Sequence, residues 1–231
     1  KGGSRYVCVA NVHMCMEVFD NSNFFPVVNN ADLVVPDGLP LVWAGRLMGD
    51  QQIGHVRGSD LMLHACARAE HGNISIGLYG GNQEALEGLI AYLRNKFPNL
   101  TISFAASPPF RPLTEEEDER YVNQINETGT KILFVGLGCP KQENWMADHR
   151  DRISCVMIGV GAAFDFFSGR KKHAPRWMQK AGLEWAFRLA CDPKRLWKRY
   201  LKHNPRFIWY FGKQWLQYKF SRKKQSVASK H

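Results

Sequence analysis

The sequence lacks the features that mark several classes of protein. No run among its 231 residues reaches the roughly 18 consecutive apolar residues of a membrane-spanning helix. The six cysteines are scattered and form no Cys-x-x-Cys pair, which predicts buried thiols in a reducing compartment rather than disulfides or a zinc site. No secretory signal peptide is visible. Because the chain enters a strand directly after Lys1-Gly2-Gly3-Ser4, we expect a fragment that lacks an N-terminal element.

Motifs of metal-dependent, serine-dependent and nicotinamide-dependent enzymes are also missing. The sequence has no His-x-x-His, no His-Glu-x-x-His, and no Asp-x-Asp of the kind with which many sugar transferases hold a metal on a nucleotide diphosphate. It has no Gly-x-Ser-x-Gly. Gly136 and Gly138 are not followed by the third glycine of a dinucleotide fingerprint. We therefore expect no metal and no cofactor.

Acidic residues are nearly absent from the last quarter of the chain. Arg170 to His231 holds 18 Lys and Arg against 2 Asp and Glu, a net charge of +16, whereas the preceding residues carry −6. Five of the seven tryptophans also lie in this quarter. Basic faces beside aromatic anchors are typical of helices at a membrane interface. RNA binding through base stacking is the competing interpretation.

Strand-like and helix-like segments alternate along the first three quarters of the chain. Strands are expected at 5–10, 33–35 (short and buried), 74–79, 100–105, 132–135 and 154–160. Helices are expected at 14–30, as two pieces broken near Asn21, and at 39–48, 60–70 after an N-cap at Ser59, and 83–97, with two more from Thr114 and Pro140. This alternation predicts a Rossmann-like α/β fold with a mostly parallel sheet and helices on both faces.

The pattern changes to helices without strands from Ala174 onward. A helix continues through Gly182-Leu183-Glu184-Trp185, and new helices start at Asp192-Pro193 and Asn204-Pro205. We therefore divide the chain into an α/β domain at 1–173 that holds the candidate catalytic groups described below, a basic helical appendage at 174–218 whose expected partner is a membrane surface, and a tail at 219–231 that we expect to be disordered.

The segment around Gly136 reads as strand, glycine turn and helix start. Gly136 and Gly138 follow the strand, and Pro140 suits a first helical turn because its missing N–H has no helical partner there. Such a junction lies at the carboxyl edge of a parallel sheet, where ligands bind, and helix N-termini attract phosphate. The first turn holds three long polar side chains that could grip a charged ligand: Lys141, Gln142 and Glu143. The alternative is a plain βα turn with solvated side chains.

Two further segments also combine the end of a strand with a glycine turn. Gly80-Gly81-Asn82 follows the strand at 74–79. Gly159 and Gly161 end the last strand, and a turn to Gly169 contains Asp165 before the basic cluster at 170–173. Cations near the ligand edge could neutralise a diphosphate leaving group, as a metal otherwise would. The alternative for this cluster is a solvated basic loop.

Two strand ends carry candidate catalytic groups. Asp37 follows the strand at 33–35 and could act as a general base on a hydroxyl group. The alternative is a turn aspartate bonded to its own backbone. Asn11 and His13 follow the first strand, where Asn could bind hydroxyl or phosphate groups and His titrates near neutrality. The alternative is a strand-end cap with a partly buried histidine.

Taken in order, the sequence blocks resemble the WecG/TagA/CpsF family of bacterial glycosyltransferases (glycosyltransferase family 26). The resemblance covers nearly the whole chain, from about Val7 to Leu201. Its blocks are Val9-Ala10-Asn11, Ala31 to Gly38, Arg57-Gly58-Ser59-Asp60-Leu61, Leu78-Tyr79-Gly80-Gly81, Gly136 to Trp145, Gly159 to Phe166, Ala174-Pro175-Arg176-Trp177, and Gly182 to Tyr200.

The resemblance implies a metal-independent, inverting transfer of a sugar from a UDP-sugar donor. The implied acceptor is a sugar on undecaprenyl diphosphate, in bacterial surface polysaccharide or teichoic acid synthesis. The implied location is cytoplasmic, peripheral on the inner face of the cell membrane. The donor sugar is of the N-acetylmannosamine or the glucose type, with a uronic acid donor as an alternative. A non-catalytic basic protein that binds membrane or RNA is the alternative from another class. The expected partners exclude nucleic acid and leave a homo-oligomer open.

The resemblance also implies roles for individual residues. Asp37 would deprotonate the acceptor hydroxyl, and Asn11 and Gln142 would orient donor or acceptor. The residues implied to bind substrate are His13, His55, Arg57, Gly80, Gly81, Asn82, Gly136, Gly138, Pro140, Lys141, Glu143 and Asp165. The residues implied to contact lipid or diphosphate are Arg195, Arg199 and Arg206.

Two positions depart from the family pattern. Val9 stands where many members have Thr, so a hydroxyl contact is lost. His55 stands where many members have Arg, with Arg57 as a substitute. Both departures bear on which UDP-sugar is the donor.

Overall fold

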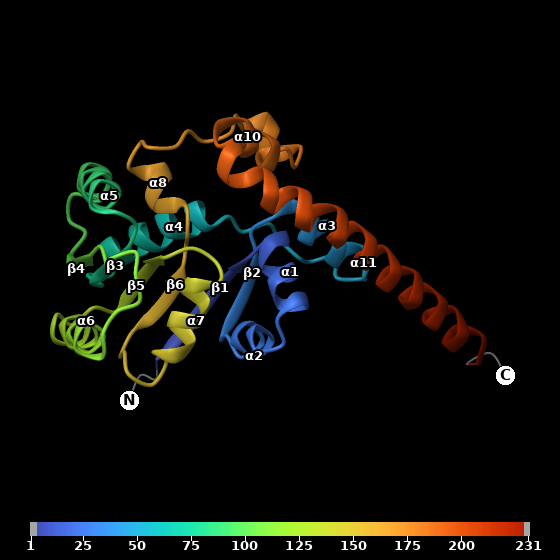
Figure 1. Ribbon diagram of the computed structural model, residues 1–231, viewed down its shortest axis with the longest axis horizontal. Helices are drawn as coiled ribbons and strands as arrows, with labels where there is room; N and C mark the ends of the chain where they lie inside the picture. The colour runs from blue at the N-terminus through green and yellow to red at the C-terminus, as the bar shows by residue number, and fades with distance from the viewer. Residues whose placement is uncertain (1–3, 229–231) are drawn as a thin grey trace. The chain divides into compact units, whose positions relative to one another are not determined.

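The structure, a computed structural model, describes residues 4–228, with side chains described as far as Ser221. Six strands form one sheet in the order β2-β1-β6-β5-β3-β4 (Figure 1). The strands are β1 (Arg5–Ala10), β2 (Leu33–Pro36), β3 (Ile76–Gly80), β4 (Ile102–Ala106), β5 (Ile132–Gly136) and β6 (Val156–Gly159). The pairs β1–β6, β6–β5, β5–β3 and β3–β4 are parallel. The predicted parallel α/β fold is therefore confirmed.

Helices follow the strands and then continue alone to the end of the described chain. They are α1 (Val12–Asp20), α2 (Phe24–Asn29), α3 (Leu39–Leu47), α4 (Gly58–His71), α5 (Gln83–Lys96), α6 (Glu115–Glu127), α7 (Lys141–Asp148), α8 (Ala163–Phe167), α9 (Arg176–Lys180), α10 (Glu184–Cys191) and α11 (Pro193–Ala228). The break near Asn21 that we expected separates α1 from α2.

The chain forms two compact units. Within the described residues, the first unit holds 4–9, 21–35 and 56–173, and the second holds 10–20, 36–55 and 174–228. The boundary after His173 coincides with the expected start of the appendage. The second unit, however, also includes two earlier segments that we had assigned to the catalytic domain.

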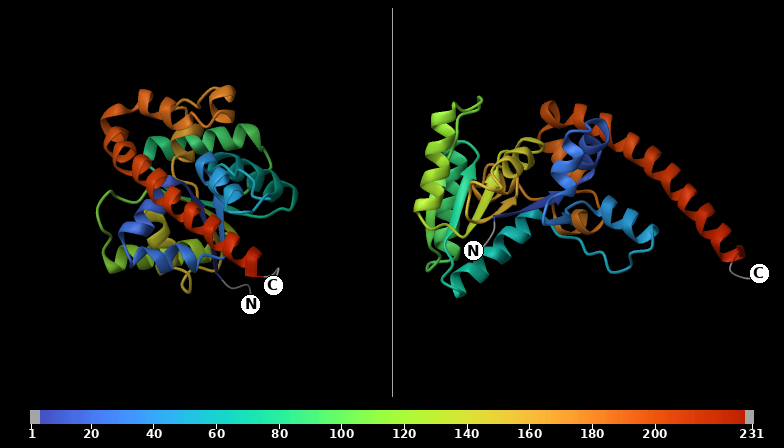
Figure 2. Two further views of the ribbon diagram at one scale, coloured as in Figure 1. Left: turned by 90° about the vertical axis from the view of Figure 1, so that its right-hand side faces the viewer. Right: turned by 90° about the horizontal axis from the view of Figure 1, so that it is seen from below.

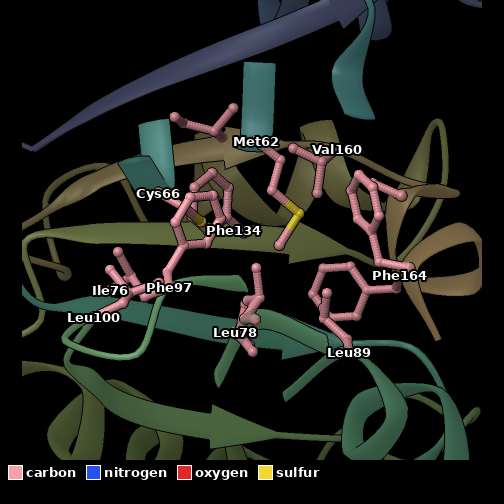
Figure 3. Close-up of a cluster of buried hydrophobic side chains, with 14 of the residues drawn as sticks. Met62, Cys66, Ile76, Leu78, Leu89, Phe97, Leu100, Phe134, Val160 and Phe164 are labelled. Carbon is pink, nitrogen blue, oxygen red and sulfur yellow. The ribbon is translucent and has the colours of Figure 1, made fainter. Parts of the chain in front are cut away.

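The main core of the first unit lies between the sheet and the helices α4, α5 and α8 (Figure 3). Met62, Leu89 and Phe164 project from these helices toward Leu78 of β3 and Phe134 of β5. All five side chains are at most 1% exposed. Full burial of such a side chain stabilises the fold by about 1.5–3 kcal/mol, so this layer holds α4, α5 and α8 against the sheet. Helices α2, α6 and α7 cover the other face (Figure 1).

Two helices of this unit begin with a side-chain cap. Thr114 and Glu117 form a reciprocal capping box at α6. The Asn82 side chain caps α5 by accepting from the backbone N–H of Ala85. The expected cap at Ser59 is wrong, because α4 already begins at Gly58 after Arg57. A Cβ on Gly58 would lie 3.5 Å from the carbonyl oxygen of Val160, so the start of α4 packs in van der Waals contact with the end of β6.

Two further local expectations are wrong. The strand at 33–35 is not buried, because β2 is an edge strand; Leu33 is 53% exposed and Val34 is 42% exposed. The segment from Gly161 to Gly169 is not only a turn. It contains the short helix α8, whose Phe164 and Phe167 join the core.

The second unit is mainly helical, and α11 packs along α1. Gly182 has a φ of +73°, which ends α9 and separates it from α10, contrary to the continuous helix that we expected there. The expected new helix at Asn204-Pro205 is also wrong, because α11 runs through Pro205 as a single helix (Figure 2). It continues to Ala228, whereas we expected disorder from Lys219; residues 229–231 lie outside the described chain. No helix in the described part combines the length and apolar character needed to cross a bilayer.

Candidate active site

The turn between β5 and α7 is built around glycines. Gly138 has a φ of +82°, in the left-handed region that favours glycine. A Cβ on Gly136 would lie 2.7 Å from the ring of Phe164, so the absence of a side chain lets α8 pack against β5. Pro140 is the N-cap of α7 rather than part of its first turn. The first turn of α7 follows with Lys141 exposed.

Gln142 and Glu143 are buried, at 4% and 0% exposure, so the alternative of solvated side chains at this turn is wrong for these two residues. The Gln142 amide donates to Glu143 Oε1 over 2.6 Å. Burial raises the pKa of the Glu143 carboxyl, and hydrogen bonds from Gln142 and Cys139 oppose that rise. Gln142 Oε1 has no hydrogen-bond partner among the described residues. The side-chain oxygen of Gln142 can therefore accept a hydrogen bond from a ligand, and Glu143 holds the side-chain nitrogen of Gln142.

The junction of β3 and α5 meets the β5 turn through backbone atoms. Gly80 pairs with Gly136 in the sheet, and a Cβ on Gly80 would lie 2.6 Å from the Gly136 backbone. The N–H of Gly81 donates to the Gly136 carbonyl over 3.1 Å. Asn82 caps α5 and also accepts from Arg170 over 3.0 Å. The structure thus gives these residues packing and capping contacts that join the two predicted turns.

Asp165 lies on α8 and pairs with Lys171 from the basic cluster. The Lys171 N–H also donates to the Asp165 carbonyl over 3.0 Å. Arg170 pairs with Glu84 at the start of α5, at 2.5 Å. Two cations of the cluster are therefore held beside the glycine junctions by acids of the same unit.

Arg57 precedes α4, and its guanidinium contacts the Asp60 carboxylate at 2.5 Å. The pair is partly exposed. Arg57 therefore stands at a helix N-terminus with its orientation fixed by a residue of the first turn.

In the second unit, the structure brings Asn11, Asp37 and His55 together. The Asp37 N–H donates to the carbonyl of Ala10 over 2.7 Å. The ideal Cβ position of Gly38 is 3.9 Å from Asn11, and the His55 imidazole contacts the Asp37 carbonyl oxygen. Asn11 Oδ1 accepts from the Met14 N–H over 3.2 Å, as a cap on α1. Asp37 therefore sits in a short turn directly after β2, with its backbone held by Ala10 and His55 and with Asn11 next to Gly38.

His13 is turned toward α11 rather than toward Asn11 and Asp37. Its ring centroid is 5.0 Å from that of His203, and Glu17 lies beside both rings. Burial lowers the pKa of His13 to about 4, and the nearby cation Arg199 adds to this effect. This placement does not support the predicted substrate-binding role of His13, which stays a prediction.

The three arginines assigned to lipid or diphosphate differ in their surroundings. Arg206 forms a two-pronged pair with Asp20 of α1, at 2.8 and 2.5 Å. Arg195 pairs with Asp192 at 2.6 Å. The Arg199 Nε is buried and has no hydrogen-bond partner among the described residues. Only Arg199 is therefore without a carboxylate partner within this part of the chain.

Sequence reasoning assigned no role to several residues that contact the predicted site residues. Phe164 fills the space left by Gly136 and Gly81, and Glu17 and His203 flank His13. The spacing of four residues between His13 and Glu17 was a usable signal, since it places both on one helix face. An open hollow on α6, lined by acidic and polar side chains, includes none of the predicted site residues.

Comparison with known proteins shows which family the chain belongs to. The chain matches the Glycosyl transferase WecG/TagA/CpsF family over residues 1–221. It is 29% identical over 196 residues to an N-acetylglucosaminyldiphosphoundecaprenol N-acetyl-beta-D-mannosaminyltransferase of Bacillus subtilis (strain 168), covering 84% of this chain and 74% of the relative. A protein of the same name from Staphylococcus aureus (strain NCTC 8325 / PS 47) is 31% identical over 209 residues, covering 90% of this chain and 80% of the relative. The chain therefore belongs to the WecG/TagA/CpsF family of glycosyl transferases.

Proposed function

We propose that the protein transfers N-acetylmannosamine from a UDP-linked donor to N-acetylglucosamine on undecaprenyl diphosphate, with inversion at the anomeric carbon. The observation that carries this proposal is the shared name of relatives that match 84% and 90% of the chain. The glycine turns after β3 and β5 support a nucleotide diphosphate donor, because such turns expose backbone N–H groups to phosphate.

Asp37 is the proposed general base. Its carboxylate takes the proton from the acceptor hydroxyl as that oxygen bonds to the anomeric carbon. The bond from the anomeric carbon to the diphosphate oxygen breaks at the same time, and UDP leaves with the electron pair. The short turn between β2 and α3 supports this role, since the Asp37 backbone is bonded to Ala10 and His55. These two contacts hold the backbone that carries the carboxylate.

Asn11 and Gln142 are the proposed orienting residues. Asn11 adjoins the Asp37-Gly38 turn, and its side-chain oxygen is held by the Met14 N–H in the first turn of α1. Gln142 offers a buried acceptor oxygen at the first turn of α7. Lys141 on that turn, and Lys171 with Arg170 beside the other glycine junctions, are proposed to offset the charge that develops on the departing diphosphate.

The acceptor is proposed to be reached at the inner surface of the cell membrane through α11. This helix carries exposed apolar and aromatic side chains: Trp197, Leu201, Ile208, Trp209, Leu216 and Phe220. Lys198 and Lys213 lie over the rings of Trp197 and Trp209. Aromatic side chains with adjacent cations suit an anionic membrane surface, where each basic residue contributes about 1 kcal/mol.

Transfer by purified protein tests the reaction. The protein is incubated with a synthetic polyprenyl-diphosphate N-acetylglucosamine and, in parallel, UDP-N-acetylmannosamine, UDP-glucose and a UDP-uronic acid, without added divalent metal. We expect UDP release and a disaccharide product with UDP-N-acetylmannosamine. Turnover with UDP-glucose or the uronic acid alone would overturn the donor assignment.

The base is tested by Asp37→Asn. We expect turnover to fall by about 100-fold to 10,000-fold, the range that removal of a general base produces. Asp151→Asn is the matched control, because Asp151 is exposed and precedes the start of β6, whereas the glycine turns follow the ends of the strands. Near-normal turnover by Asp37→Asn would refute the role of Asp37 while leaving the reaction itself standing.

A further inference from the structure

Two histidines and one glutamate converge in the second unit, where α1 packs along α11. His13 and Glu17 lie four residues apart on α1, and His203 comes from α11. One ligand atom from each lies within 4.8 Å of the other two. His203 is 4% exposed, whereas the side chains of His13 and Glu17 are 15% and 26% exposed. The cluster is thus shielded on the α11 side and reachable from solvent on the α1 side.

The distances within this cluster are too long for hydrogen bonds and suit a shared ion. Nε2 of His13 lies 3.4 Å from Glu17 Oε1, and Nε2 of His203 lies 3.7 Å from the same oxygen. A direct hydrogen bond would bring nitrogen and oxygen to about 2.7–3.2 Å. Zinc binds nitrogen and oxygen ligands at about 2.0–2.2 Å, so tetrahedral neighbours lie roughly 3.3–3.5 Å apart.

The imidazole nitrogens also have unmet bonding capacity. The Nδ1 atoms of His13 and His203 are buried without a hydrogen-bond partner among the described residues. Their Nε2 atoms face Glu17 beyond hydrogen-bond distance. An ion bound at the Nε2 atoms would give each ring a partner at the nitrogen that faces Glu17, and it would leave the Nδ1 atoms as they are.

We propose that His13, Glu17 and His203 bind one divalent transition-metal ion of the zinc class, which fastens α11 to α1. Two imidazoles and a carboxylate favour zinc over magnesium or calcium, which prefer oxygen ligands alone. Three protein ligands leave a fourth position for water. The site joins residues separated by almost the whole chain and is independent of the proposed transfer reaction.

The surrounding charges set the expected affinity. Arg199, Lys202 and Arg206 of α11 lie near the cluster and oppose a cation. Asp20 offsets part of this charge, because it pairs with Arg206 at 2.5 Å and with Lys202 at 3.6 Å. We therefore expect binding weaker than at a four-ligand structural zinc site, and the titration extends to submillimolar zinc.

Zinc binding by the full chain tests the proposal. The protein is prepared without a histidine tag, freed of metal by dialysis against a chelator, and titrated with zinc chloride by calorimetry. Cobalt titration, followed by visible absorption, reports the coordination directly. We expect one equivalent of zinc per chain and a melting temperature that rises with zinc.

Glu17→Gln and His203→Ala should each weaken zinc binding at least about tenfold, since loss of even an outer-shell partner costs that much. His71→Ala is the control, because His71 is exposed at the end of α4 and should leave binding unchanged. If His203→Ala does not fold, Glu17→Gln carries the test, because it retains the size of the side chain. Absence of zinc binding, or equal binding by Glu17→Gln and the parent, would overturn the proposal.

Discussion

The Glu143 carboxyl at the β5–α7 turn is fully buried beside Gln142. Its pKa is raised in the folded chain, so folding favours the protonated form. The stability that this group contributes is full below its unfolded pKa, about 4.3, and is lost as pH rises through the higher folded pKa. Replacement by an uncharged side chain of the same size removes this dependence.

Glu143→Gln should therefore gain stability relative to the parent as pH rises above the ordinary carboxyl pKa of about 4.3. The Gln side chain can still accept the hydrogen bond from Gln142 through its amide oxygen. Urea unfolding at a series of pH values measures the difference. Glu127→Gln, at an exposed position on α6, should follow the parent at every pH. Parallel pH profiles for Glu143→Gln and the parent would contradict the buried-carboxyl interpretation.

The same turn shows what residue patterns can and cannot predict. The strand, the glycine turn and the start of α7 follow from the apolar run, the two glycines and Pro140. The burial of Gln142 and Glu143 does not follow, because it depends on a distant residue. Gly159 of β6 leaves room for the Gln142 amide, which lies 2.9 Å from where a Cβ would stand. A polar side chain can be placed on a helix from sequence, but its exposure is set by tertiary packing.

At the scale of elements, α8 depends on a glycine in β5. A methyl group on Gly136 would lie 2.7–2.9 Å from the Phe164 ring, which has no space to retreat because it is 1% exposed. Gly136→Ala should therefore destabilise the fold by about 1–3 kcal/mol, the usual cost of overpacking. Denaturant unfolding midpoints measure the change.

Gly54→Ala is the matched control for that substitution. Gly54 is exposed, and a Cβ there would meet nothing within 4 Å. We expect its stability to stay within about 0.5 kcal/mol of the parent. Equal midpoints for Gly136→Ala and Gly54→Ala would show that β5 and α8 can shift to accept the methyl group.

Element order was predictable, but the continuity of the C-terminal helices was not. We expected a helix to continue through Gly182 and a new helix to start at Pro205, and the structure shows the opposite at both positions. Gly182 takes a left-handed backbone conformation that ends a helix. Pro205 removes one backbone donor from α11 and has a low helix propensity. The helix continues through it because tertiary contacts, such as the packing of α11 along α1, override this local preference.

At the scale of the whole molecule, the charge asymmetry was visible in the sequence but the composition of the second unit was not. The basic helices join segments 10–20 and 36–55, which precede them by more than a hundred residues. Local periodicity carries no information on such pairings. Asp37, Asn11 and His55 therefore belong to the same compact unit as α11, an arrangement that no motif along the chain indicates.

The exposed apolar side chains of α11 make a prediction about the membrane. Ile208 is 70% exposed and Trp209 is 63% exposed, with Lys213 over the Trp209 ring. Burying such a side chain in a lipid interface is worth up to about 1.5–3 kcal/mol. The double variant Ile208→Ser/Trp209→Ser should therefore bind anionic phosphatidylglycerol vesicles at least tenfold more weakly, as measured by sedimentation with the full chain.

Phe110→Ser is the control for this measurement, because Phe110 is 85% exposed but lies on a loop of the first unit. It should bind vesicles like the parent. Added salt should weaken binding of all three proteins, since the basic residues of α11 remain and their attraction to anionic lipid is screened. If the double variant and Phe110→Ser lose affinity equally, the attachment is a general surface effect and α11 does not direct it. If only the double variant loses affinity, and its circular dichroism matches the parent, the apolar side chains of α11 are the part that enters the lipid.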